Sequence, residues 1–200
     1  AELWVRGLRE TCPVPRIIVP RADPPPVIDG RVDDPAWKGA ALTELMSSSS
    51  AWPRKVVTKV RLCCSDAALF VLAELPSPPH PGSAEDDAFV VELSPWRDAQ
   101  RSVRVVVRNA PQGGDLPKGV KCQVEKLWIQ RDSVKTEAGW TVEMEIPFAA
   151  LGLEPPGKRG LWAANFVREG TMPAFPFRSM PVAVSWATVD SGSMMLAPES

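Results

Sequence analysis

The chain has 200 residues, of which 44% are hydrophobic, and a formal net charge of −1. This length favours one domain that buries roughly 70% of the unfolded surface in a single core. The balanced charge gives no basic field for nucleic acid, and no apolar run approaches the ~20 residues that span a bilayer. The 22 prolines and 13 glycines lie between short β-branched runs, which favours many strands joined by irregular loops over a helical bundle.

The first 25 residues are rich in proline and show little periodicity, which predicts an extended segment (1–25) ahead of one domain (26–200). Residues 16–19 can add an outer strand. No signal peptide is visible, so we expect a mature chain, an excised domain or a cytosolic protein. Residues 33–35 (DDP) are expected to begin a helical turn that caps its own amides and turns Trp37 inward.

Alternating apolar residues predict strands along the rest of the chain. In 56–64, one face carries Val60, Leu62 and Cys64, and Cys63 is expected on the more exposed face. Residues 69–73 are apolar on both faces, which is typical of a central strand. Further strands are predicted at 89–93, 103–108, 122–130, 161–168 and 181–188. Residues 132–139 are expected to form a polar turn.

The stretch 140–153 (WTVEMEIPFAALGL) shows the alternation most clearly. One face of the expected half-buried strand carries Trp140, Val142, Met144 and Ile146, and the other carries Thr141, Glu143 and Glu145. Pro147 ends the strand, and 148–151 can make one helical turn closed by Gly152. Together these patterns predict an all-β, two-sheet antiparallel β-sandwich, immunoglobulin-like or jelly-roll-like, with about nine to eleven strands and one or two short helical turns.

Six motifs follow one another between about residues 26 and 186: PVIDGRVDDPAW, TKVRLCCSDAALFV, EDDAFVVEL, GWTVEMEIPFAALG, LWAANFVR and SWAT. In this order they resemble the family 9 carbohydrate-binding modules, which belong with the DOMON-like β-sandwiches. The resemblance implies a two-sheet sandwich that binds sugar ends, is extracellular or periplasmic and can hold structural calcium.

The resemblance also implies a sugar site between the loops 76–87 and 190–198, with Arg104 at its floor. Arg104 matches a family arginine that bonds sugar hydroxyls. The two tryptophans that hold the sugar in the family are not matched here, since small residues replace one and Met194 or Met195 lies near the other. The family's acidic strand residue is displaced to Glu92, which can pair with Arg104 across the sheet. A weak or degenerate sugar site is therefore expected.

Other residues have both a structural and a functional interpretation. Trp52 and Trp96 lie in polar, proline-flanked loops, where stacking on a sugar or a protein surface is as plausible as packing. His80, the only histidine, is a candidate ligand for sugar, metal or haem, and its alternative is a solvated loop residue. Apolar neighbours favour core packing for Trp37, Trp140, Trp162 and Trp186.

An acidic run, Glu85, Asp86 and Asp87, could supply oxygens to calcium, or could protect a strand edge from aggregation. No catalytic arrangement stands out, so no enzyme is expected. We expect a non-catalytic carbohydrate-binding-like module, an accessory domain of a larger secreted or surface protein. One alternative is a structural or protein-interaction domain on the same fold. The other is a haem-binding DOMON-type domain, for which the chain offers only one histidine as a ligand of the cofactor haem.

Overall fold

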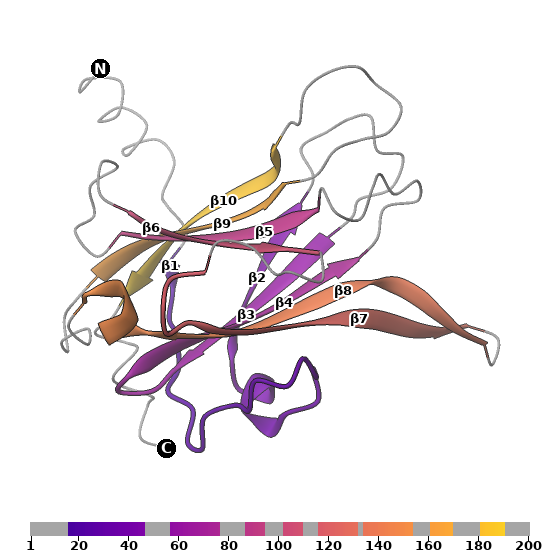
Figure 1. The fold of residues 1–200 in the computed structure, drawn as a ribbon, viewed down its shortest axis with the longest axis horizontal. Coiled ribbons are helices and arrows are strands. Elements are labelled where there is room, and N and C mark those ends of the chain that lie inside the picture. The colour runs from indigo at the N-terminus through magenta and orange to yellow at the C-terminus, as the bar shows by residue number, and fades with distance from the viewer. Residues whose placement is uncertain are drawn as a thin grey trace.

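The computed structural model describes residues 16–46, 57–76, 87–94, 102–109, 116–131, 134–153, 161–169 and 181–190. Within these ranges the chain forms two facing five-stranded sheets (Figure 1). The strand order in sheet A is β1 (Arg16–Ile17), β10 (Pro181–Asp190), β9 (Leu161–Glu169), β5 (Ala88–Ser94) and β6 (Val103–Arg108). The order in sheet B is β2 (Ala41–Met46), β3 (Val57–Cys64), β4 (Ala68–Pro76), β8 (Val134–Pro147) and β7 (Lys121–Arg131).

These ten strands confirm the predicted all-β, two-sheet sandwich. Neighbouring strands are antiparallel, except that β1 runs parallel to β10. The predicted helical turn is also present as a 3-10 helix, η3 (Phe148–Leu151), and Gly152 closes it in the left-handed region at φ 66°. That conformation is easiest for glycine, because at a positive φ the Cβ of any other residue comes too close to the residue's own backbone.

The core lies between the sheets and is built from alternate residues of each strand. From β8 it receives the predicted face, Trp140, Val142, Met144 and Ile146, and β5 and β9 contribute Phe89, Val91, Leu93, Trp162 and Phe166. All of these side chains are at most 5% exposed. The predicted core packing is therefore confirmed for Trp140 and Trp162.

A strap, which we define as residues 20–40, crosses the outer face of sheet B, where Figure 1 draws it in indigo below the strands. It contains the 3-10 helix η1 (Pro35–Lys38), and Asp34 caps this helix by accepting a 2.9 Å hydrogen bond from the Ala36 amide. The predicted turn and its cap are thus confirmed. Trp37 is 3% exposed and packs against the outward side chains of β3 and β4, so β4 is covered on both faces, as predicted.

The strap overturns two expectations about the outer face of sheet B. Cys63 was expected to be more exposed than Cys64, but the two are 1% and 2% exposed, because Trp37 packs over Cys63. Strand β8 was expected to be half-buried, yet Glu143 on its outer face is 0% exposed. Period-two alternation separates the two faces of a strand, but it does not report whether another segment covers the second face.

The strand boundaries differ from the prediction in two further places. Residues 134–139, expected to lie in a polar turn, belong to β8 and pair with β7 in a hairpin that extends beyond the rest of the sandwich (Figure 1). Strand β2 was not predicted, and it forms because its backbone pairs with β3. Neither segment shows a clear alternation of apolar and polar side chains. Each forms a strand because pairing with its neighbour satisfies the hydrogen bonds of its backbone N–H and C=O groups.

The residues before position 26 already contact both sheets. Strand β1 confirms the outer strand predicted near residues 16–19, and the amide of Cys64 donates to the carbonyl of Pro20 at 2.9 Å. The division of the chain into a segment 1–25 and a domain 26–200 stays a prediction.

Candidate functional site

A row of polar side chains crosses the outer face of sheet A. The strand register places Arg104 of β6 opposite Glu92 of β5, and Glu92 opposite Asn165 of β9, so the three residues share one face. Arg104 Nε lies 3.4 Å from Glu92 Oε1, and Asn165 Nδ2 donates to Glu92 Oε2 at 3.2 Å. The predicted ion pair between Arg104 and Glu92 is therefore present.

Arg104 has a second carboxylate partner. Its Nη2 donates to Glu169 Oε1 at 2.7 Å, a shorter distance than the contact with Glu92. Glu169 lies opposite Ala88, which is four positions before Glu92 on β5. The ion pair from Arg104 to Glu169 therefore runs diagonally across the sheet, over the row in which Val90 is paired with Val106 and Val167. Val90 belongs to a small apolar cluster on the same face, with Ala88, Val106 and Val167.

The carbonyl oxygen of Asn165 has no hydrogen-bond partner among the described residues. The side chain is only 6% exposed, so this acceptor lies where an unmade hydrogen bond costs about 1–3 kcal/mol. This oxygen is unsatisfied and covered, so a ligand can donate a hydrogen bond to it only when a neighbouring side chain on this face moves aside. The sequence reasoning missed Asn165 and Glu169, although both follow the outward alternation of the LWAANFVRE strand.

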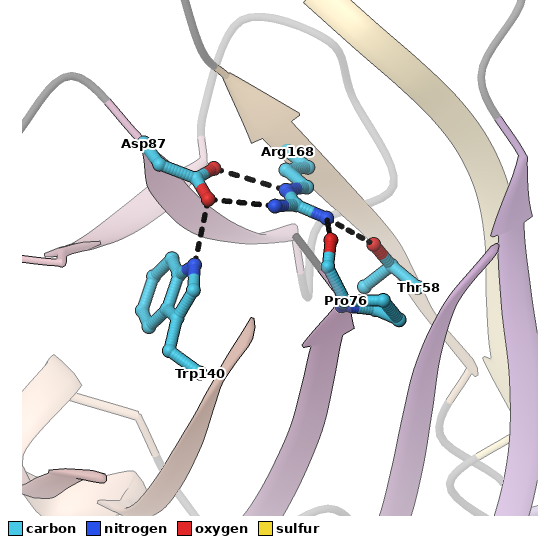
Figure 2. A network of polar contacts seen from close by, with 5 residues as sticks. All are labelled: Thr58, Pro76, Asp87, Trp140 and Arg168. Carbon is cyan, nitrogen blue, oxygen red and sulfur yellow. Dashed lines mark hydrogen bonds and ion pairs between the residues drawn. The ribbon is translucent and has the colours of Figure 1, made fainter. Parts of the chain in front are cut away.

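Arg168 points the opposite way, into the sandwich, where it joins the two sheets at one end (Figure 2). Its Nε and Nη2 donate to the two oxygens of Asp87 at 2.9 and 2.6 Å. Its Nη1 donates to the carbonyl of Pro76 at 2.8 Å and to Thr58 Oγ1 at 3.5 Å, and Trp140 Nε1 donates to Asp87 Oδ2 at 2.7 Å. The Arg168 side chain is 6% exposed, so this ion pair is largely protected from water and joins the ends of β4, β5 and β9.

These contacts bear on the candidate calcium ligands. Both oxygens of Asp87 already accept hydrogen bonds, from Arg168 and Trp140. Asp87 would have to give up these bonds to coordinate a calcium ion. Among the described residues there is no group of three or more His, Cys, Asp or Glu side chains that could hold a metal ion. Glu85 and Asp86 lie outside those residues, so the calcium site stays a prediction.

The structure places only part of the predicted sugar site. Arg104 and Glu92 lie together, as expected for a floor of polar groups. Trp52, Trp96, His80, Met194 and the side chain of Trp186 lie outside the described residues. So do residues 77–86 and 191–198 of the two loops that were expected to border the site. Their assignments stay predictions.

Two facing sheets, antiparallel except for the pairing of β1 with β10, define a β-sandwich. The chain has the fold of a family 9 module. A structure of such a module from Caldicellulosiruptor kristjanssonii, in complex with cellotriose, superposes with a TM-score of 0.60. The two chains are 18% identical, and the match covers 88% of this chain and 92% of that one.

A second solved structure, a putative carbohydrate-binding protein from Bacteroides uniformis, matches with a TM-score of 0.48 and 14% identity. The match covers 88% of this chain and 97% of that chain. No protein-family model and no curated protein matches the chain. Among the described residues, no helix is long and apolar enough to cross a membrane. The relation to DOMON-like sandwiches stays a prediction.

Proposed function

We propose that this domain is a non-catalytic carbohydrate-binding module whose ligand binds on the outer face of sheet A, at Arg104, Glu92 and Asn165. The observation that carries the proposal is the carbonyl oxygen of Asn165, which is buried without a partner among the described residues and lies beside two charged side chains. The family 9 fold is consistent with this function, because the solved module with that fold binds cellotriose.

The chemistry of the row suits a sugar. A sugar hydroxyl both donates and accepts, so it can donate to Asn165 Oδ1 or to Glu92 while it accepts from the guanidinium of Arg104. Hydrogen bonds to charged groups are stronger than neutral ones, which favours Arg104 and Glu92 as anchors. Water competes for each of these groups, so the net contribution of one bond is about 1 kcal/mol.

Without the two family tryptophans, the affinity should be low, with a dissociation constant of about 1 mM. We place the domain outside the cytoplasm, in the extracellular space or the periplasm, as an accessory domain of a larger secreted or surface protein. This part of the proposal follows the resemblance in sequence and fold to family 9 modules.

A glycan array followed by calorimetry on the best ligand tests the proposal. Asn165→Val should weaken binding about fivefold or more, yet keep the free energy of unfolding within about 1 kcal/mol. The substitution removes the hydrogen bond from Nδ2 to Glu92, but it also removes an unpaired buried acceptor and places a strand-favouring residue. Arg104→Ala should also weaken binding. Lys121→Ala, on the outer face of sheet B, is the matched control and should leave the affinity unchanged.

Three outcomes would contradict the proposal. An array on which no glycan binds would reject the function. Binding that survives both Arg104→Ala and Asn165→Val would show that the site lies elsewhere. A large loss of stability in Asn165→Val would show that the Asn165 side chain serves the fold rather than a ligand.

A further inference from the structure

We propose that Glu169 is an internal competitor for the ligand-binding arginine: it holds the guanidinium of Arg104 away from the sugar, so that binding requires this ion pair to open. The inference rests on the proposed function, because it concerns the same row on sheet A. It assigns Glu169 the role of weakening the site.

The geometry around Arg104 separates the roles of its two carboxylate partners. Glu92 lies directly opposite Arg104 on the neighbouring strand and contacts Nε, close to the aliphatic stem of the arginine. Glu169 lies two strands away and contacts Nη2, at the far end of the guanidinium. Glu92 can therefore keep the stem in place while the end of the side chain changes partner from Glu169 to a sugar hydroxyl.

The ion pair is weak enough for a neutral ligand to displace. The side chains of Arg104 and Glu169 are 49% and 40% exposed, so water and salt screen the attraction. A ligand hydroxyl that accepts from Nη2 offers a neutral acceptor in place of a carboxylate. Each binding event therefore includes the loss of the Arg104–Glu169 contact, and the measured affinity is lower by that amount.

Opening the ion pair also changes what lies beneath it. The pair crosses the row of Val90, which is 0% exposed, and its neighbours Val106 and Val167 are each 7% exposed. When Arg104 turns toward the ligand, it uncovers part of this cluster. The apolar C–H face of a sugar ring can then pack on valine side chains, which compensates in part for the unmatched tryptophans.

Removal of Glu169 should therefore strengthen binding, which a residue needed only for structure does not do. In calorimetry with an uncharged oligosaccharide, Glu169→Gln should lower the dissociation constant and Glu169→Ala should lower it further, by about two- to fivefold, the range that an exposed ion pair supports. The matched control is Glu145→Gln, which removes a 2.7 Å ion pair with Lys121 on the outer face of sheet B and should not change the affinity.

Salt gives a second measurement on the same proteins. Screening weakens the Arg104–Glu169 pair, so the wild type should bind the uncharged sugar more tightly as salt rises from about 0.01 to 0.5 M. Glu169→Ala should bind equally well at both concentrations. Because the ligand carries no charge, this dependence reports the internal pair.

The outcomes separate this inference from the proposed function. If the wild type binds a glycan and the two Glu169 variants bind it equally or more weakly, Glu169 is not a competitor and the proposed function stands. If the wild type binds a glycan and Glu169→Ala binds the same glycan more tightly, both are supported. If neither protein binds any glycan, the proposed function fails and this inference fails with it.

Discussion

The indole Nε1 of Trp37 donates a 2.7 Å hydrogen bond to Oε1 of Glu143, 106 positions later in the chain. The amides of Asp29 and Gly30 donate to Oε2 of the same carboxylate at 2.9 and 2.7 Å. One buried side chain of β8 thus accepts from three groups of the strap. This carboxylate joins the strap to the outer face of sheet B, and the three donors compensate for the burial of its charge.

Glu143→Gln should lower the free energy of unfolding by about 1–3 kcal/mol. The amide group of glutamine brings a donor where the carboxylate has an acceptor, so either Trp37 or the two backbone amides lose their partner. Urea denaturation measures the loss. Glu145→Gln, on the same face of β8 but partly exposed, should change stability by less than about 1 kcal/mol. Equal losses in the two variants would show that the strap does not depend on Glu143.

The pH dependence of stability should carry a contribution from the same group. Burial raises the pKa of Glu143, and the N–H donors of Trp37, Gly30 and Asp29 lower it only in part. The folded protein therefore binds this proton more tightly than the unfolded chain. The contribution is fully present below the usual glutamate pKa of about 4.3 and is lost as pH rises through the raised pKa. The stability difference between wild type and Glu143→Gln should accordingly narrow with rising pH, and a difference that widens would contradict the burial effect.

Gly30→Ala should destabilise the domain by more than about 1 kcal/mol. Gly30 has a φ of 85°, and a Cβ at this position would clash with the side chain of Glu125 on β7. Gly39→Ala is the control, since φ is −93° there and, among the described residues, nothing beyond its own chain neighbours lies within 4 Å of an added Cβ. Thermal denaturation of the two variants should give a clear loss for the first and almost none for the second. A similar melting temperature for both would mean that the turn at Gly30 relaxes freely.

Arg168→Met should cost about 3–5 kcal/mol, because it leaves the Asp87 carboxylate inside the sandwich without its cation. Asp87→Leu should be similarly costly, since it leaves the buried guanidinium of Arg168 without its carboxylate partner. The double variant removes both charges together, so its loss should be smaller than the sum of the two single losses. Denaturant unfolding of the three proteins gives this comparison. Additive losses would show that the two residues act independently, against the contacts in Figure 2.

Cys63 and Cys122 should be slow to alkylate in the native protein. Burial raises the pKa of each thiol to about 12, and only the thiolate reacts. With iodoacetamide at pH 8, peptide mapping should find both residues labelled about 100-fold more slowly before denaturation than after it. Rapid labelling of Cys63 in the native state would mean that the strap leaves sheet B often.

The sequence alone determined most strands and the inward face of each. Successive side chains of a strand point to opposite sides, so the alternation around Trp140 reports local geometry that no distant residue can change. The same holds for the cap at Asp34 and the turn at Gly152, which depend on residues a few positions away. Arg104 and Glu92 could be placed together because their strands are neighbours in the chain.

Only the tertiary structure decided which polar side chains are buried and which meet. Glu143 and Cys63 lie inside because the strap covers sheet B, and nothing in the pattern of β8 or β3 reports that cover. The contact of Arg104 with Glu169 depends on the pairing of β5 with β9, whose residues are about 75 positions apart. Strand pairing and register are set by the packing of the whole chain, so the candidate site appears only when the sheets are assembled.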